Sequence, residues 1–432
     1  MKKRWCLAGA LLLACDAAPT RLSPAPPARA PAPPGIADAA RTDRKVFATY
    51  LPWYEARPGW DHWKWLDHDP ENVVAGRRQI AAAHYPRIGP YDSRDDAVMG
   101  HHLMLLAAAG VDGVFINWYG RGNRLDEVTR ALFDRTAAWR ASYALPFSLA
   151  LMLDAEPYLG LPAADRTGAL AADLADVLFS LAGRPEYQRL EGKPVVLWFP
   201  KPDPGDAAKP ALTPAALQEV RKGQIVPFWL GVEHPDPTYR ESADLAYGWI
   251  AGVDGDGTDY GKTYLDWLYP TFAARRKEGW ELPVGIGVAY PGFDDGGVYA
   301  WSHDRTRRRR IDRSIGGTPT LDRTWDALES YERTGGSPVN WLQVATFNDW
   351  NEGSEIEPSQ EHGTAALGIV ARRARAFKKQ AVPDAATLEF AWRCADNYLE
   401  RRRAGRSDQD LAPALHRYFA GAYAEALAIM ER

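Results

Sequence analysis

Short apolar runs alternate with amphipathic stretches along the chain from Lys45 onward, and this alternation predicts the fold. Apolar positions at helical spacing predict helices over Asp95–Ala109, Leu125–Ser142, Arg166–Ala182, Pro214–Lys222, Thr263–Glu278 and Leu321–Thr334. The eight apolar runs predict strands at Val46–Leu51, Val111–Asn117, Phe147–Leu153, Val195–Phe199, Phe228–Val232, Leu245–Ile250, Val284–Ala289 and Leu342–Phe347. Strands that alternate with helices pair in parallel through right-handed crossovers. We therefore predict an α/β fold, a (β/α)8 TIM barrel. The alternative is an open doubly wound sheet, but no Gly-rich phosphate loop follows the first run.

The two ends of the chain do not follow this pattern. Residues 1–15 have a basic start and a short apolar run that ends at Cys15, which predicts a lipoprotein-type export signal with Cys15 as the lipidated residue. The alternative is an ordinary cleaved secretory signal. Residues 16–43 are rich in Pro and Ala and predict a stiff tether. We expect a barrel over residues 44–380, lipid-anchored at the cell envelope, on its periplasmic or outer surface.

A short C-terminal extension is predicted over residues 385–432. Two helical patterns, Leu388–Arg402 and Ala412–Arg432, flank a polar break. Two helices bury too little apolar surface to be stable alone. We therefore expect a helical pair that packs on the barrel.

The start of the first barrel helix carries a capping pattern. Ser93 precedes the helical positions, and Asp96 follows three residues later. This spacing is typical of a reciprocal N-cap, so Ser93 is the predicted capping residue.

Polar and aromatic residues follow most of the predicted strands. In a barrel of this class, chemistry takes place at the C-terminal ends of the strands. Besides the residues discussed below, Tyr119, Asp154, Glu233, His234, Asp254, Asp256 and Asp294 occupy such positions. Their convergence predicts a cleft for a polar ligand such as a sugar.

A loop after the last strand concentrates four carboxylates between Asn348 and Glu357. Asp349 and Glu352, three residues apart, can point into one cleft. Two carboxylates that flank a glycosidic bond can supply a proton donor and a base or nucleophile. The alternative is a solvated turn whose acids cap a following helix. The interleaved Asn348 and Trp350 favour the active-site interpretation.

Composition narrows the range of partners. The chain has 52 basic and 56 acidic residues, a net charge of −4, which gives no reason to expect nucleic acid. The 17 Trp and 19 Tyr suit the flat faces of sugars, and they also fill a large core. Cys6, Cys15 and Cys394 allow no disulfide framework and no metal spacing, so neither a metal nor a cofactor is predicted.

Several motifs resemble those of the endo-α-mannosidases, glycoside hydrolase family 99, and of the related family 71. The acid loop at 346–358 is similar to the signature Asn-Glu-Trp-x-Glu-Gly-Thr-x-x-Glu-Pro. Further similar segments, in order, are Ala48–Tyr54, His84–Asp95, Ala109–Gly120, Glu156–Tyr158 and Tyr290–Asp295. Together these segments cover about residues 45 to 360.

The resemblance implies a (β/α)8 glycosidase that cleaves α-mannose-type glycans with retention and without a metal. Carried over, Asp349 is the base that takes a proton from the sugar 2-hydroxyl, and Glu352 is the general acid. The strand-end positions and the resemblance together predict a set of substrate-binding residues: Tyr50, Trp53, Tyr54, Trp63, Tyr91, Asn117, Trp118, Glu156, Tyr158, Tyr290, Asn348 and Trp350.

Two positions depart from the family pattern. Asp349 stands where the family has Glu, and Asn351 stands where the mannosidases have His. Other interpretations therefore stay open: an α-glucan-directed hydrolase like family 71, a transferase that acts on surface polysaccharide, or a non-catalytic barrel that binds surface polysaccharide.

Overall fold

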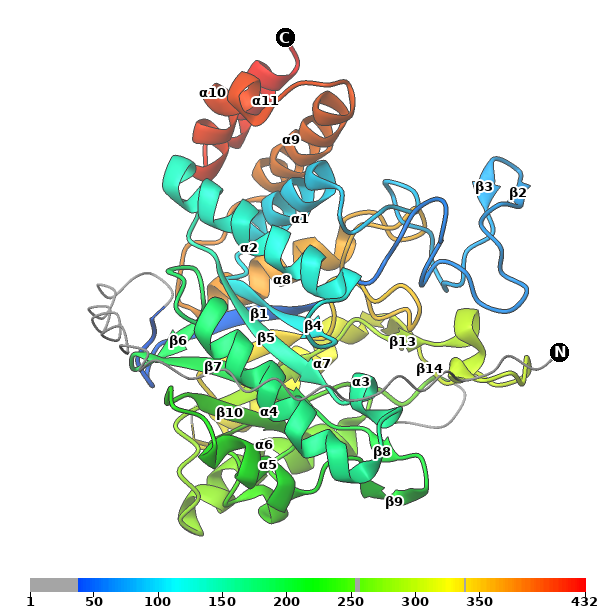
Figure 1. Ribbon diagram of the computed structural model, residues 1–432. Helices are drawn as coiled ribbons and strands as arrows, with labels where there is room; N and C mark the ends of the chain where they lie inside the picture. The colour runs from blue at the N-terminus through cyan, green and yellow to red at the C-terminus, as the bar shows by residue number, and fades with distance from the viewer. Residues whose placement is uncertain (1–37, 253–256, 338) are drawn as a thin grey trace, which may run out of the picture. The chain divides into compact units, whose positions relative to one another are not determined.

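Eight parallel strands close into a barrel in the computed structural model of the chain (Figure 1), which describes residues 38–252, 257–337 and 339–432. The hydrogen-bonded order is β10-β11-β12-β17-β1-β4-β5-β7, and β7 also pairs with β10, so the sheet has no open edge there. The strands are β1 (Lys45–Tyr50), β4 (Gly113–Trp118), β5 (Ser148–Asp154), β7 (Lys193–Phe199), β10 (Trp229–Glu233), β11 (Leu245–Tyr247), β12 (Gly285–Ala289) and β17 (Trp341–Val344). The predicted TIM barrel is confirmed.

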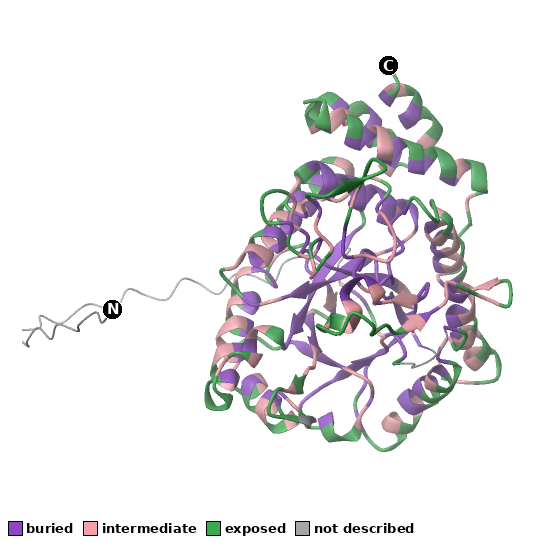
Figure 2. Ribbon diagram, turned by 90° about the vertical axis from the view of Figure 1, so that its right-hand side faces the viewer, coloured by how far each residue is buried: buried purple, intermediate pink, exposed green. Residues whose placement is uncertain are grey.

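The strands are buried on both faces. All residues of β4, β5, β12 and β17 are buried, because side chains fill the barrel on one face and helices cover the other. Figure 2 shows these buried strands inside a ring of half-exposed helices. This two-sided burial explains why the strands read as continuous apolar runs rather than as alternating ones.

Six helices follow the sequence pattern closely, and two differ from it. The six are α1 (Asp96–Ala108), α2 (Arg124–Tyr143), α4 (Ala163–Ser180), α5 (Pro214–Lys222), α6 (Lys262–Lys277) and α7 (Thr320–Arg333). The helix α8 (Ala365–Phe377) follows β17 and was not predicted, nor was the short α3 (Glu156–Leu159). Between β10 and β11 the connection holds only the 3-10 turn η1 (Pro237–Tyr239).

The predicted cap of α1 is wrong. Asp95 is the N-cap, and its carboxylate accepts a hydrogen bond from the backbone N–H of Ala97 at 2.8 Å. At Ser93 the chain has not yet turned into the helix, since its N–H donates to the carbonyl of Tyr54 at 2.9 Å.

Small hairpins elaborate the loops that follow the C-terminal ends of three strands. One lies between β1 and α1, one between β7 and α5, and two between β12 and α7. These pairs are β2 (Val73–Val74) with β3 (Arg77–Arg78), β8 (Pro202–Asp203) with β9 (Asp206–Pro210), β13 (Phe293–Asp294) with β14 (Arg310–Ile311), and β15 (Ser314–Ile315) with β16 (Thr318–Pro319). The 3-10 segment η2 (Gly296–Trp301) lies in the last of these loops, and β6 (Arg189–Leu190) pairs with the start of β7. The extra chain is thus concentrated at the end of the barrel where chemistry is expected.

The C-terminal extension contains three helices, α9 (Ala385–Arg403), α10 (Asp408–Phe419) and α11 (Tyr423–Met430). The single helix predicted over Ala412–Arg432 is divided by a turn at Gly421, whose φ of +81° suits glycine. The helix α9 packs against α1 of the barrel. All the described residues belong to one compact unit.

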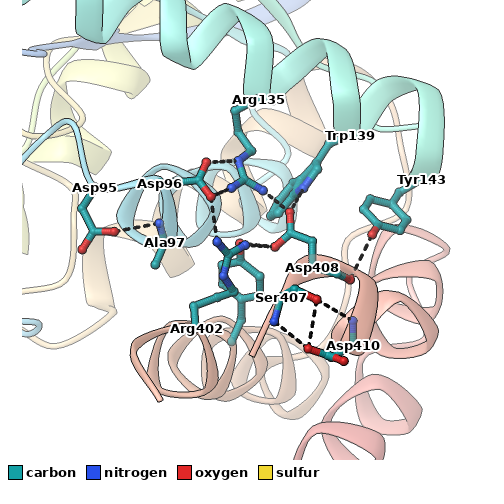
Figure 3. A network of polar contacts seen from close by, with 11 residues as sticks. Asp95, Asp96, Ala97, Arg135, Trp139, Tyr143, Arg402, Ser407, Asp408 and Asp410 are labelled. Atoms are coloured by element: carbon teal, nitrogen blue, oxygen red, sulfur yellow. Dashed lines mark hydrogen bonds and ion pairs between the residues drawn. The ribbon is translucent and has the colours of Figure 1, made fainter. Parts of the chain in front are cut away.

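A network of charges joins the extension to the barrel (Figure 3). Arg135 of α2 donates to Asp96 of α1 at 2.7 Å and also pairs with Asp408 of α10. Arg402 of α9 donates to Asp96 at 2.7 Å and pairs with the same Asp408. Trp139 of α2 adds a hydrogen bond to Asp408 at 2.8 Å. Two arginines and two aspartates therefore alternate across four helices.

Several predictions fall outside the described residues. The export signal with Cys15, most of the tether, and Asp254 and Asp256 lie there. Among the described helices, none has the length and apolar character that a membrane span requires.

Candidate active site

The acid loop after β17 folds back on itself. The N–H of Thr346 donates to the carbonyl of Ser354 at 2.9 Å, and the N–H of Glu357 donates to the carbonyl of Phe347 at 2.8 Å. Gly353 makes the turn with φ +58°, and a Cβ there would lie 3.0 Å from atoms of Asp294. The loop is therefore held by its own backbone and by a neighbouring loop, and it can present side chains in fixed positions.

Asp349 and Glu352 lie together on this turn. The backbone N–H of Glu352 donates to Oδ1 of Asp349 at 3.0 Å, and the N–H of Asp349 donates to the hydroxyl of Thr346 at 2.8 Å. Asp349 is only 4% exposed. A solvated capping turn would leave this carboxylate in water, so the alternative interpretation of the loop is wrong.

Burial and mutual repulsion disfavour two negative charges on this pair. Burial raises the pKa of Asp349 well above its usual value, and the carboxylate of Glu352 raises it further. Burial also raises the pKa of Glu352, while the nearby Trp301 N–H and Lys201 oppose that rise in pKa. A single shared proton is the favoured state of such a pair. One group can then act as a base while the other acts as an acid.

The other two carboxylates of the loop are occupied. Glu355 pairs with Arg313 at 2.8 Å and with His84 at 3.0 Å, and despite burial these charges lower its pKa. Glu357 accepts hydrogen bonds from Tyr91 at 2.7 Å and from Trp350 at 3.1 Å. Within the loop, Asp349 and Glu352 are therefore the stronger candidates for acid–base chemistry.

An aromatic wall stands beside the pair. Nε1 of Trp301 donates to Oε1 of Glu352 at 2.8 Å. The ring of His62 makes an edge contact with Trp301 and stacks on Trp53 with centroids 4.3 Å apart. Burial lowers the pKa of His62 to about 4, so its ring is neutral near pH 7. Trp53 and His62 thus form a closely packed ring pair next to Trp301.

Tyr119, which follows β4, also lies close to the pair. Burial raises the pKa of its hydroxyl well above the usual value, and the carboxylates of Asp154, Glu156, Asp349 and Glu352 raise it further. Four acids at strand ends are thus within electrostatic reach of one phenol. The strands β4, β5 and β17 bring them together, as the barrel rule predicted.

Many of the predicted substrate-binding residues are buried beneath the acid loop. Trp63 donates to the carbonyl of Tyr91 at 2.7 Å, and the hydroxyl of Tyr54 accepts from the N–H of Trp350 at 2.8 Å. The amide of Asn348 bonds both the N–H and the carbonyl of Leu51. These side chains support the loop through contacts inside the protein.

Tyr50 extends the same support. Its hydroxyl lies 3.1 Å from Nδ1 of His102, and Nε2 of that ring lies 3.1 Å from Glu357. The sugar contacts predicted for this buried group of residues stay predictions.

The remaining predicted residues divide between the mouth and the outer helices. Asn117 donates to Asp154 at 3.0 Å and keeps a buried carbonyl oxygen without a partner, while Glu156 is exposed at the mouth. Trp118 donates to Asp126 of α2, Tyr158 donates to Asp173 of α4, and Tyr290 donates to the carbonyl of Tyr260. For Trp118, Tyr158 and Tyr290, a sugar contact stays a prediction, and the hydrogen bonds that these side chains make within the protein do not support it.

Asn351, at the position where the resemblance suggested His, has a clear local role. Its amide donates to the carbonyls of His62 and Ala81, each at 2.7 Å. It therefore ties the acid loop to the long loop between β1 and α1.

Sequence reasoning missed Trp301 and Lys201. Lys201 follows β7, so the strand-end rule could have found it. Burial opposes its charge, but Asp154, Glu352, Glu156 and Glu233 together raise its pKa, so it is a cation among carboxylates. Trp301 lies 51 positions before Glu352 in an irregular loop, and no sequence pattern signals it. Within the described residues, no cluster of three or more His, Cys, Asp or Glu could hold a metal.

A closed parallel barrel with an acid pair at the C-terminal ends of its strands has the architecture of a carbohydrate-cleaving TIM-barrel enzyme. The chain belongs to glycosyl hydrolase family 99, because the sequence model of that family matches residues 43–374. The resemblance seen in the sequence is confirmed. The protein is a glycoside hydrolase of the endo-α-mannosidase-like group, and the alternative of a non-catalytic barrel is set aside.

Individual relatives are distant. The glycoprotein endo-alpha-1,2-mannosidase of Mus musculus is 22% identical over 353 residues, which cover 74% of this chain and 69% of that protein. The endo-alpha-1,2-mannosidase-like protein of Homo sapiens is 23% identical over 343 residues, 72% of this chain and 68% of that protein. The GH99 endo-alpha-mannosidase structure from Bacteroides thetaiotaomicron has a TM-score of 0.56 and 17% identity, and the match covers 78% of this chain and 98% of that one.

Proposed function

We propose that this protein hydrolyses α-mannoside-type glycans with retention of configuration, with Asp349 as base and Glu352 as general acid. One observation carries the proposal. Of the four carboxylates in the acid loop, Glu355 pairs with cationic side chains and Glu357 is enclosed by core hydrogen bonds, whereas the buried Asp349 and the half-buried Glu352 have raised pKa values. The names of the family relatives support an α-mannoside as the substrate.

The first step needs both members of the pair. The ionised Asp349 takes the proton of the sugar 2-hydroxyl, and the 2-oxygen attacks the anomeric carbon as the bond to the leaving oxygen breaks. The protonated Glu352 gives its proton to that oxygen, so the glycan leaves as an alcohol and a 1,2-anhydro sugar remains. In the second step the ionised Glu352 takes a proton from water, the water oxygen bonds to the anomeric carbon, and Asp349 returns its proton to the 2-oxygen. Two inversions give net retention.

Singly protonated, the pair has the charge that this mechanism requires. Trp301 donates to Oε1 of Glu352, which fixes the orientation of the acid. Lys201 favours the ionised form of both carboxylates, which allows the pair to lose one proton. The aromatic wall of Trp53, His62 and Trp301 supplies apolar surface beside the pair.

The test compares two variants on two kinds of leaving group. Glu352→Gln is expected to lose about 10²- to 10⁴-fold in rate on natural α-mannosides, because general acid catalysis is removed. It should recover much of that loss on an activated aryl α-mannoside, whose leaving group needs no proton. Asp349→Asn should lose activity on both substrates. Glu400→Gln, an exposed position on α9, is the matched control.

Substrate analogues complete the test. A 2-deoxy analogue has no 2-hydroxyl to deprotonate, so it should not be cleaved, and the first-formed product should have the configuration of the substrate by NMR. An Asp349→Asn variant that keeps most of the wild-type rate would show that Asp349 is not the base. Cleavage of α-glucans alone would replace the anhydro-sugar route with direct use of the two carboxylates.

We further propose that the enzyme is exported and lipid-anchored through Cys15, on the basis of the apolar run before that residue. Wild-type protein expressed in a bacterial host should then partition with membranes, and Cys15→Ala should release it or block its processing. Unchanged membrane association of the Cys15→Ala variant would contradict the lipid anchor.

A further inference from the structure

A hollow of about 790 Å³ lies beside the catalytic mouth, within the size range of ligand sites in proteins. It is bounded by the loops that follow β7 and β10 and by the start of α6. Its lining includes Pro200, Lys201, Glu233, His234, Pro237 and Trp267. None of the predicted substrate-binding residues lines this hollow.

Lys201 connects the hollow to the acid pair. The ammonium of Lys201 interacts electrostatically with Glu352 of the acid pair and with Glu233, which lines the hollow. Glu233 ends β10, and burial raises its pKa to about 7, against the opposing charge of Lys201. Lys201 therefore belongs both to the lining of the hollow and to the electrostatic surroundings of the acid pair.

Trp267 at the rim is unusually exposed. Among the described tryptophans, Trp267 and Trp301 are the most exposed, at 45% and 36%. Trp301 already contacts Glu352, whereas Trp267 has no role in the acid pair. A second hollow of about 600 Å³, which Thr263 also lines, is lined by the same tryptophan. Trp267 thus contributes to the walls of two hollows.

Neighbouring rings hold this indole in place. His234 and Tyr264 make ring contacts with Trp267, with centroids 5.9 and 6.0 Å away. Burial lowers the pKa of His234 to about 4, so near pH 7 its neutral ring has one donor and one acceptor nitrogen. Nε2 of His234 lies 3.4 Å from Glu233. An apolar face beside a neutral imidazole, a carboxyl group and an ammonium matches a hexose, with C–H bonds on one face and hydroxyls at its edge.

We propose that Trp267, His234 and Glu233 form a distal subsite that binds one hexose of an extended glycan, away from the bond that is cleaved. This proposal rests on the proposed glycosidase function and deepens it, since it assigns the enzyme to substrates longer than those that fill the mouth. Binding energy from such a remote sugar helps to position the reacting one.

The experiment measures binding in the Glu352→Gln background, so that turnover does not consume the ligand. α-Linked manno-oligosaccharides of two to six residues are the probes, and calorimetry gives the Kd for each length. Trp267→Ala should weaken binding of the longest oligosaccharide by about tenfold, since it removes a large apolar contact face. The loss should shrink as the oligosaccharide shortens. Trp267→Phe should restore most of the affinity because it keeps a flat ring.

Phe179→Ala, an aromatic 90% exposed on α4, is the matched control for loss of a surface ring. A Trp267→Ala variant that follows this control at every chain length would overturn the subsite. If no manno-oligosaccharide binds, the same series is repeated with α-linked gluco-oligosaccharides. A chain-length-dependent loss there supports the subsite and contradicts the α-mannoside specificity, whereas no dependence on Trp267 in either series overturns the subsite.

Discussion

The two sides of the catalytic mouth are built differently. The closed side lies under the acid loop, next to β17 and β1, and consists of Tyr54, Trp63, Tyr91, Trp350 and Glu357. These side chains form buried hydrogen bonds, and the rings belong to an apolar cluster separate from the main barrel core. The open side, beyond β7 and β10, consists of Lys201, Glu233, His234 and Trp267, which line a hollow.

The difference separates two tasks. The closed side fixes the acids, because each of its polar groups is held by a partner within the protein. The open side keeps charges and an exposed ring available to a ligand. Substitutions on the closed side should therefore change stability and catalysis together. Substitutions on the open side should change pH dependence and substrate preference while the fold persists.

The largest effect is expected from Glu357→Ala on the closed side. The substitution leaves Tyr91, Trp350 and His102 without their shared acceptor, and breaking a buried charged network of this kind costs about 3–5 kcal/mol of unfolding free energy. Displacement of the acid loop by about 1 Å should also lower kcat about a hundredfold. Thermal unfolding and initial rates measure the two effects.

Glu357→Gln and Glu400→Ala are its controls. The glutamine keeps one acceptor and the side-chain volume, so the loss of stability should be smaller. The exposed Glu400→Ala should stay within about 0.5 kcal/mol of wild type. A Glu357→Ala variant as stable and active as this control would remove the distinction between the two sides.

A smaller effect is expected from Lys201→Met on the open side. Lys201 lowers the pKa values of both Asp349 and Glu352, so its removal raises them. The acidic limb of the pH profile of kcat/KM, which reports ionisation of the base, should therefore move to higher pH. If the limb moves by about one pH unit, the rate on its acidic side should fall about tenfold.

The stability of the Lys201→Met variant should change little. Lys222→Met, an exposed exchange on α5, should leave the profile in place. An unchanged profile in the Lys201→Met variant would show that the open side does not influence the acids.

The smallest effect is a gain in stability from Asp349→Asn. The folded-state pKa of Asp349 is raised, so the proton stabilises the fold at low pH, and that contribution is lost as the pH rises through the folded pKa. Asparagine does not titrate. The variant should therefore match wild type below about pH 4 and exceed it in stability near pH 7. The gain in unfolding free energy should be about 1.4 kcal/mol for each tenfold difference in proton affinity between the folded and unfolded chains.

Melting temperatures across pH 4 to 8 measure this difference. Asp165→Asn at an exposed position should change stability by at most about 0.5 kcal/mol. If the difference in stability between Asp349→Asn and wild type does not grow with pH, burial does not raise the pKa of Asp349 in the folded protein.

The sequence alone was enough to predict the barrel, and it directed attention to Asp349 and Glu352, whose catalytic roles stay a prediction. The eight strands of the barrel are continuous apolar runs because both faces of each strand are buried. Most helices are joined to the next strand by a short link, so the alternation can be recognised within short stretches of sequence. Asp349 and Glu352 were found because they are neighbours on one loop. Trp301 and Lys201 reach Glu352 from loops far away in the sequence, so only the closed barrel shows that they meet.

The side-chain directions were less predictable. A residue at the end of a strand can face the barrel interior or a helix, and adjacent residues face opposite ways. Asn117 bonds to Asp154 at the mouth, whereas Trp118, the next residue, bonds to Asp126 of α2. Aromatic character alone could not distinguish a residue that supports the acid loop from one that contacts a sugar.

The packing of α9 against α1 has a consequence for the order of events during synthesis. Eleven of the thirteen residues of α1 are buried, and Gly100 of this helix lies directly under the ring of Tyr398. The helix α1 leaves the ribosome almost 300 residues before the α9 residues that cover it. Until then the face of α1 that α9 covers stays open, so packing of this part of the barrel can be completed only after translation has passed the barrel itself.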